Sequence, residues 1–563
     1  MTDFFSRQTR RQFLATQGAA LTALAGWTPL ASAMTRTAVK HTDRHATANL
    51  WLRDPIDPAL LRQLAAHAMD AAKQAGATYA DIRLSARREL RVSAGDEERG
   101  AINYFAPGGG ELVTFSAYGV RAMVDGAWAF VNGATFTPDA VAEAARRAVA
   151  DARAYAEARV AGPTAAAEWT AASAVTGSWE TPMQVDPFAA PLHDHYDLLG
   201  AFMQAANRSV RIHTYIHVSW KDEQRVFAST EGSVISQRWH RVIPIGTVSL
   251  GDPWVSPAVT IRQLDGQSGG MEMLAIPIIQ DHIKAAAEDA RMVGLLPERP
   301  FDVGRYPAVF DGRAMGMMLG STLNMGLELE RALGYNPDGV TILSPPEDFL
   351  GAQFAAPMVS VMSDPTLPAL STSKWDDEGA LTRPFPVIRD GRIMTYFTTR
   401  VNAPLLRARA AKASHGITLP EQGSAIAWDV TEPPMGCGGH LTMSEGTSNA
   451  SLDDLCREIS RGVLIRAASN VIFDQSVSGG ILRRGTVMLA IERGAVTHRV
   501  GGAALQFKTK TFWKNVTALG DSGTVETNTR YSTYGVPGSL LTETMRAPAA
   551  SVSAVDIIQL PKA

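Results

Sequence analysis

Apolar positions in the first half of the chain recur at two different spacings. Between residues 57 and 75 they return every three or four positions, which is typical of an amphipathic helix, and Gly76 follows where helices commonly end. The next stretch alternates like a strand. Residues 112–131 then predict two strands joined at Asp125-Gly126, a dipeptide suited to a type I′ turn.

The same half continues with helices and strands that do not follow a βαβ rhythm. An alanine-rich helix is predicted over residues 137–156, with Thr137 as its N-cap, and further helices over residues 196–206 and 276–293. Strands dominate residues 210–251 between them. Strands without regular crossover helices favour an antiparallel sheet covered by helices, which is an α+β arrangement.

Strands and turns dominate the chain from residue 306 onward. The dipeptides Asp390-Gly391 and Arg493-Gly494 lie between alternating apolar runs and predict two hairpins. Ser451, placed three residues before an acidic side chain, predicts the start of a helix that runs to about residue 463. This half is therefore expected to be mainly β and barrel-like.

The first 33 residues have the features of a twin-arginine export signal. Arg10 and Arg11 are followed after one residue by a Phe-Leu pair and a mildly apolar run, and Ala31-Ser32-Ala33 supplies a small-x-small cleavage pattern. The run is shorter than the roughly 20 residues that span a bilayer. We expect cleavage after Ala33, export to the periplasm or beyond, and no stable membrane anchor; an amphipathic first helix is the alternative.

These patterns divide the chain into four segments within an α+β fold class. They are a signal peptide at residues 1–33, a flexible lead at 34–56, an N-terminal α+β domain with an antiparallel sheet at 57–300, and a mainly β, barrel-like C-terminal domain at 301–563.

Composition narrows the function classes. The chain has 53 basic and 56 acidic residues, and residues 1–33 hold three arginines and one aspartate, so the remainder has a net charge of −5. Such a chain lacks the basic surface that nucleic acid requires. Cys437 and Cys456 alone do not make a disulfide framework. Cys437 and His440 have the spacing of half a metal site, but no second pair accompanies them, and zinc normally takes four ligands.

Three segments of the second half carry a family resemblance when they are taken together. They are residues 319–328 (LGSTLNMGLE), residues 376–379 (DDEG) followed by a hairpin, and residues 473–480 (FDQSVSGG) followed by another. In this order and spacing they resemble the TldD/TldE family, also called the PmbA or "modulator of gyrase" family. Residues 76–81 and 119–121 resemble its N-terminal domain.

The resemblance implies a metallopeptidase fold whose subunits pair as a dimer around the active site. The TldD kind of subunit carries His-Glu-x-x-x-His and a later cysteine ligand, and the TldE kind lacks that motif. Here Gly320 takes the first histidine position, Ser321 the glutamate position and Met325 the second histidine position, and residues 520–535 contain no cysteine. Glycine offers no ligand, a thioether suits copper(I) better than zinc, and a hydroxyl is too weak a base.

We therefore expect a zinc-free, TldE-like subunit that has no metal or cofactor of its own and is inactive alone. It would pair with a TldD-like zinc peptidase subunit and shape a cleft for unfolded or processed peptides. The candidate residues of this peptide cleft are Ser321, Asn324, Glu328, Asp377 and Glu378. The alternatives are a buried helix start in which Met325 fills core space, and a solvated turn at residues 376–378.

Two other function classes stay open on the sequence alone. The first is a hydrolase that uses Ser268 or Ser321, because residues 266–270 (GQSGG) approach the G-x-S-x-G elbow. That elbow needs a buried strand before its serine, and the residues before Gly266 do not form one, so a flexible glycine loop is favoured. The second is a peptide-binding homodimer without enzymatic activity.

Overall fold

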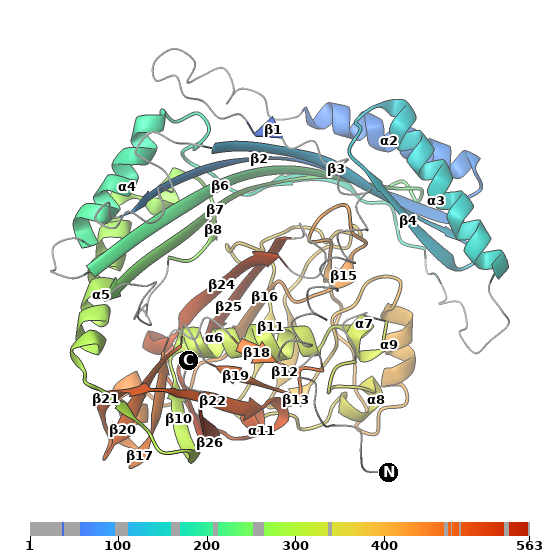
Figure 1. Ribbon diagram of the computed structural model, residues 1–563. Helices are drawn as coiled ribbons and strands as arrows, with labels where there is room; N and C mark the ends of the chain where they lie inside the picture. Colours follow the sequence, from blue (N-terminus) through green and yellow to red (C-terminus); the bar gives the residue numbers. More distant parts are fainter. Residues whose placement is uncertain are drawn as a thin grey trace, which may run out of the picture.

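The structure is a computed structural model in which a curved sheet arches over a second, sheet-rich body (Figure 1). It describes residues 37–38, 57–95, 111–158, 169, 171–206, 212–250, 264–335, 340–466, 471–473, 476–482, 486–533 and 540–560. The predicted signal residues Arg10, Arg11 and Ala33 lie outside the described residues, as does nearly all of the predicted lead at residues 34–56.

The arch is an eight-stranded sheet with the order β1-β3-β2-β6-β7-β5, in which β4 pairs with β3 and β8 with β7. Its long strands are antiparallel to one another, as expected, whereas β5 is parallel to β7. Its strands are β1 (Thr37–Ala38), β2 (Tyr79–Gly95), β3 (Glu111–Val124), β4 (Ala127–Gly133), β5 (Thr176–Glu180), β6 (Ile212–Ser229), β7 (Val234–Leu250) and β8 (Gln267–Ser268).

Helices cover the convex face of this sheet, and charged residues occupy its concave face. Along β2, Ile82 and Leu84 pack under the first pair of helices and Leu90 under the second pair, while Asp81 and Arg83 point to the other side. This division follows from the two-residue period of a strand. The helices are α2 (Pro58–Gln74), α3 (Pro138–Ala158), α4 (Leu192–Ala206) and α5 (Ile276–Leu295), with a short 3-10 turn η2 (Met271–Leu274) before α5.

Local signals in the sequence account for where these elements begin and end. Gly76, just after α2, has φ +87°, as a helix-terminating glycine requires. Asp125 and Gly126 have φ 48° and 77°, which confirms the type I′ turn between β3 and β4. The Thr137 hydroxyl accepts a hydrogen bond from the Ala140 amide at 3.3 Å, which confirms the predicted cap of α3.

The C-terminal half contains two large open sheets and a two-stranded ribbon. The ten-stranded sheet has the order β18-β19-β22-β26-β10-β17-β20-β21-β9, with β23 on β26. Its strands are β9 (Glu298–Pro300), β10 (Gly304–Phe310), β17 (Arg461–Arg466), β18 (Val471–Phe473), β19 (Gly479–Leu482), β20 (Val487–Glu492), β21 (Ala495–Gly501), β22 (Ala503–Lys508), β23 (Val516–Leu519) and β26 (Ala550–Gln559).

The second large sheet of this half has six strands in the order β13-β12-β11-β16-β25-β24. These are β11 (Val361–Ser363), β12 (Phe385–Arg389), β13 (Arg392–Ile393), β16 (His440–Met443), β24 (Glu526–Thr533) and β25 (Leu540–Ala547), and the ribbon is β14 (Ala425–Ile426) with β15 (Met435–Gly436). The α+β class is confirmed. The described strands of this half form open sheets instead of one closed barrel, because α6 (Gly312–Met318) lies between the sheets and contacts both.

Short helices connect the strands of the C-terminal half. They are η3 (Leu319–Asn324), α7 (Leu329–Ala332), α8 (Pro346–Phe349), α9 (Ala403–Ala410), α10 (Leu452–Arg457), α11 (Thr509–Lys514) and η4 (Ser522–Thr524). The predicted capping box at Ser451 is present, but the helix predicted to run to residue 463 ends at Arg457. Residues 461–466 form β17 instead, because they pair with both β10 and β20. Both predicted hairpins are present, with Asp390 at φ 48° and Arg493 at φ 52°.

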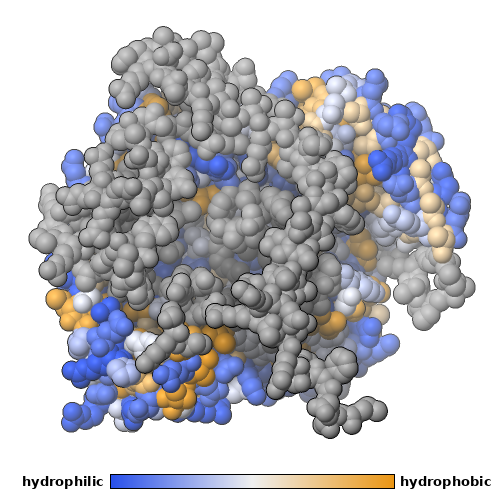
Figure 2. Space-filling view, in the orientation of Figure 1, coloured by the Kyte–Doolittle hydropathy of each residue, from blue (hydrophilic) through white to orange (hydrophobic). Residues whose placement is uncertain are grey.

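The described surface mixes polar and apolar residues (Figure 2). Large apolar side chains are exposed near the end of α5, at Met292 and Leu295, and between β9 and β10, at Val303. Within the described ranges, no helix combines the length and apolar character needed to cross a membrane. The domain boundary near residue 300 stays a prediction.

Candidate functional site

The segment that replaces the metal motif is a buried helix that changes its winding. Asp311 caps α6 by accepting a hydrogen bond from the Ala314 amide at 2.8 Å, and the helix continues into η3, which is wound as a π-helix. Every residue of η3 is buried. Short π segments within helices are frequent at functional sites, so the backbone of this segment keeps a feature common to such sites.

The side chains at the three motif positions are engaged in packing. Ser321 is 3% exposed and its hydroxyl lies 3.7 Å from the Met317 sulfur, and Met325 is 6% exposed. These contacts agree with the alternative of a buried helix start. The residues do not fit zinc, because they offer no side chain at Gly320, a hydroxyl at Ser321 and a thioether at Met325. No group of three or more His, Cys, Asp or Glu in the described part of the chain is placed to hold a metal ion.

Asn324 at the end of η3 connects this segment to two distant residues. Its amide nitrogen lies 2.5 Å from Oε1 of Glu543 on β25 and 3.7 Å from the Cys437 sulfur, and its amide oxygen accepts from the Gly438 amide at 3.0 Å. The Cys437 sulfur lies 3.9 Å from Glu543 Oε1. Sequence reasoning identified Asn324 and considered Cys437, but it missed Glu543, since no local pattern distinguishes that residue.

A cavity of about 80 Å³ lies between the concave face of the N-terminal sheet and the C-terminal half. This is several times the roughly 10–15 Å³ that one water molecule requires. The N-terminal wall is formed by Arg87, Lys221, Glu223, Arg225, Trp239 and Arg241. The opposite wall comes from residues 363–382, residues 423–439 and Thr542, and it includes Cys437. The cavity therefore extends from the Asn324 neighbourhood to a charged sheet face.

The acidic run at residues 376–378 joins the two halves. Arg121 of β3 donates to Glu378 Oε1 and to Asp81 Oδ2, both at 2.6 Å, and Arg225 of β6 donates to Asp377 Oδ1 at 2.7 Å. Burial lowers the pKa of Arg121, but Asp81 and Glu378 outweigh it and hold this pKa above its ordinary value. Asp377 and Glu378 are 8% and 2% exposed, which excludes the solvated turn.

The loop around this run is also held through its backbone. The side chains of Trp239, Arg241 and Gln237 on β7 donate to the carbonyl oxygens of three loop residues at 2.8, 3.0 and 3.1 Å. These acceptors are Thr372, Leu370 and Trp375. The concave face thus binds an irregular chain segment through side-chain donors.

Asp377 is the one cleft candidate from the sequence that lines the described cavity. Glu328 is 4% exposed, and its carboxylate accepts from Arg331 Nε at 3.2 Å. Burial raises the pKa of Glu328 to about 8, against the opposing effect of Arg331. Ser321, Asn324, Glu328 and Glu378 are not among the residues that line this cavity.

Neither serine considered as a nucleophile contacts a base among the described residues. The Ser268 hydroxyl donates to the Ala369 carbonyl oxygen, and the Ser321 hydroxyl faces the Met317 sulfur. Ser268 lies in the two-residue strand β8, which pairs antiparallel with β7 at the edge of the arch. This context differs from the strand-to-helix elbow that a G-x-S-x-G nucleophile requires.

Comparison with known families agrees with this geometry. Residues 303–558 match the model described as "PmbA/TldA metallopeptidase C-terminal domain". This matched segment is the C-terminal domain of the TldD/TldE family, also called the PmbA or "modulator of gyrase" family.

One curated relative and two solved structures align with more than half of the chain. A metalloprotease from Methanothermobacter thermautotrophicus is 22% identical over 335 residues, which are 59% of this chain and 68% of that protein. The solved structure of TldE from Thermococcus kodakarensis matches with a TM-score of 0.62 and 15% identity over 88% of this chain and 99% of that one. A candidate modulator of DNA gyrase from Bacteroides thetaiotaomicron matches with a TM-score of 0.61 and 16% identity, over 89% and 99% of the two chains.

Proposed function

We propose that this protein is a zinc-free, TldE-like subunit of an exported peptidase complex. It shapes a cleft for unfolded or processed peptides, and a TldD-like partner supplies the metal that activates water. The reaction of the complex is hydrolysis of peptide bonds.

The single observation that carries the proposal is the set of residues at the three motif positions, two within η3 and one directly after it. A metallopeptidase needs ligands for its ion and a base for its water. Here the three positions hold Gly320, a buried hydroxyl beside sulfur at Ser321, and the buried thioether of Met325. The surrounding fold and the cavity remain, which supports a role in binding and not in water activation.

Within the complex, this chain's own residues would hold and orient the peptide. Side chains of β7 already donate hydrogen bonds to backbone carbonyl oxygens of residues 370–375. An extended peptide would present carbonyl oxygens of the same kind to this sheet face. The cavity also brings Trp239 and Trp428 near polar groups, as sites for peptides commonly do. Export rests on the twin-arginine pattern at Arg10 and Arg11, and a fusion of residues 1–40 to a reporter that requires this pathway tests it.

The test of the complex uses the purified full chain alone and co-purified with a TldD-like chain from the same organism. Elemental analysis of the isolated chain should find no stoichiometric zinc, and peptide hydrolysis should appear only with the partner. Stoichiometric zinc in the isolated chain would overturn the proposal. Failure to co-purify, together with a homodimer in solution, would favour a peptide-binding homodimer instead.

A further inference from the structure

Basic side chains from three neighbouring strands converge on one end of the cavity. Arg87 on β2, Lys221 on β6 and Arg241 on β7 all line it. Glu89, next along the same face of β2, is the register partner of Lys221, and Lys221 is in turn the partner of Arg241. The odd-numbered positions of β2 and β6 share the concave face, so the three cations point toward the same space.

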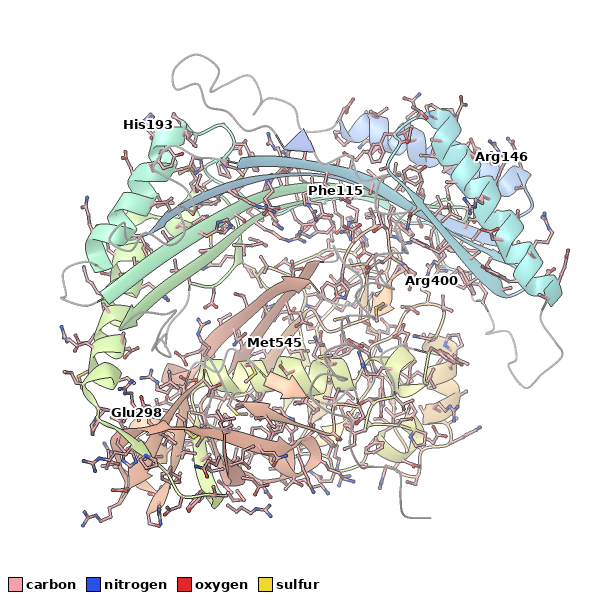
Figure 3. All side chains as sticks on the ribbon, viewed as in Figure 1. Phe115, Arg146, His193, Glu298, Arg400 and Met545 are labelled. Atoms are coloured by element: carbon pink, nitrogen blue, oxygen red, sulfur yellow. The ribbon has the colours of Figure 1, made fainter. Side chains whose placement is uncertain are left out.

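Arg87 differs from the other cations of the cavity in its contacts. Arg225 is bound to Glu223 and Asp377, and Arg241 Nη1 lies 3.0 Å from Glu223 Oε2. The guanidinium of Arg87 instead lies 4.9 Å from the ring centre of Phe115, and it makes no hydrogen bond or ion pair with a described residue. Figure 3 places Phe115 on the underside of the arch, above the C-terminal half. The donors of Arg87 therefore remain available to a ligand.

Lys221 lies at this end of the cavity among charges of both signs. Its ammonium group lies 3.4 Å from Glu89 Oε2 and is 4% exposed. Burial lowers the pKa of Lys221 to about 7, with Arg87 and Arg91 adding to that effect and Glu89 opposing it. Buried cations that repel one another are stabilised when an anion enters between them.

The remaining wall of the cavity offers neutral polar and aromatic groups. The Ser371 hydroxyl lines the cavity, is buried, and has no hydrogen-bond partner among the described residues. Trp239 and Trp428 add apolar surface. Glu223, Asp376 and Asp377 also line the cavity, and these carboxyl groups disfavour a dianion such as phosphate more than a monoanion.

We propose that this end of the cavity binds the free C-terminal carboxylate of a short peptide, with Arg87 as its principal ligand and Lys221 and Arg241 beside it. The preceding residue of the peptide lies against Trp239, and the chain continues toward Cys437 and the end of η3. The assignment deepens the proposed function, on which it rests for the choice of a peptide as ligand. It makes this subunit the one that recognises peptide ends.

The test is calorimetric titration of the full chain with N-acetyl-Gly-Leu-Phe and with the C-terminal amide of the same peptide. The acid should bind at least tenfold more tightly than the amide, because a charge-assisted hydrogen bond is about twice as strong as a neutral one. Arg87→Gln should weaken the acid about tenfold and leave the amide unchanged.

Arg91→Gln is the matched control. Arg91 lies four residues further along the same strand, carries the same charge, and is bound to Glu89 outside the cavity lining. It should change acid binding less than twofold. An equal loss in both variants would mean diffuse electrostatic attraction and would overturn the site.

Three further outcomes would also overturn it: equal affinity of acid and amide in the unmodified chain, no binding of either peptide, or displacement of the acid by equimolar inorganic phosphate. The first comparison needs no variant, so it decides even if Arg87→Gln does not fold. None of these measurements involves zinc or a partner. The carboxylate site and the subunit role can therefore fail separately.

Discussion

The two walls of the cavity are stabilised by different physical means. The N-terminal wall is a sheet face held to the C-terminal half by buried ion pairs, such as Arg121 with Glu378 and Arg225 with Asp377. The wall behind Cys437 is formed around η3, whose motif positions contribute volume and little polarity. Metal-ligating side chains are thus missing at the three motif positions, while charge is concentrated on the sheet face that lines the cavity.

The sheet face therefore depends on buried ion pairs, and the wall around η3 depends on apolar packing. Losing one member of a buried ion pair leaves an uncompensated charge, whereas exchanging one buried apolar side chain for another of similar volume is tolerated. Substitutions on the sheet face should therefore be much more costly than substitutions at the former motif positions.

The largest effect is expected for Arg121→Met. This change removes the guanidinium that Asp81 and Glu378 share and leaves Asp81 only the longer ion pair with Arg83 at 3.6 Å, at a cost of about 3–5 kcal/mol. Thermal unfolding followed by circular dichroism should show a large decrease in Tm. Arg146→Met is the matched control, since Arg146 lies exposed on α3 in an i,i+3 pair with Glu143 (Figure 3), and it should change stability by less than about 0.5 kcal/mol. Equal Tm values for both variants would contradict the clamping role of Arg121.

The second prediction concerns pH and Glu328. Burial raises the pKa of Glu328 to about 8 in the folded chain, so the folded state keeps a proton that the unfolded state loses near pH 4.5. Stability should therefore fall as pH rises through this window, by a few kcal/mol at about 1.4 kcal/mol per pKa unit. Burial raises the pKa of Glu330 and of Asp376 to about 7 in the same direction.

Glu328→Gln isolates the contribution of this residue, because the amide oxygen can still accept from Arg331 but cannot ionise. The variant should match the unmodified chain at pH 5 and exceed it in Tm at pH 8.5. Parallel Tm profiles for the two proteins across this range would show that Glu328 does not titrate in the window.

The third prediction addresses the contact between η3 and β25. Asn324→Ala removes the hydrogen bonds to Glu543 and to the Gly438 amide and leaves buried polar groups, at a cost of about 1–3 kcal/mol. Asn324→Asp should be worse above neutral pH, because it places a second carboxylate beside Glu543. Denaturant titration of both variants at pH 6 and pH 8 checks this order, and an Asp variant as stable as the original at pH 8 would contradict it.

The sequence predicted those parts of the fold that depend on neighbouring residues. Turns at Asp125, Asp390 and Arg493 followed from dipeptides that tolerate positive φ, and the caps at Thr137 and Ser451 from side-chain chemistry within one helical turn. The helix at Ser451 was predicted too long because pairing with β10 and β20, which no local pattern reveals, makes residues 461–466 a strand.

The site was predictable to a smaller extent for the same reason. The substituted motif at Gly320, Ser321 and Met325 was evident because its positions are adjacent in the chain. The contacts that surround the cavity join residues far apart, with Arg121 and Glu378 separated by 257 positions and Asn324 and Glu543 by 219. Such pairs depend on how the sheets assemble. The sequence alone therefore could not show that the acidic run at residues 376–378 is buried and binds arginines of the N-terminal sheet.

The smallest effect is expected for Met325→Leu, and it tests the packing side of the comparison most directly. Met325 is 6% exposed, and a leucine of similar volume should cost less than about 1.5 kcal/mol. If the thioether only fills space, activity of the complex with a TldD-like partner and affinity for N-acetyl-Gly-Leu-Phe should both be unchanged within twofold.

Met325→His is the informative contrast, because it restores the family residue at one position while adding a polar ring to a buried site, and it should lower Tm without adding zinc. A loss of activity in Met325→Leu at unchanged Tm would mean that the sulfur has a chemical role, and the wall around η3 would then be more than packing.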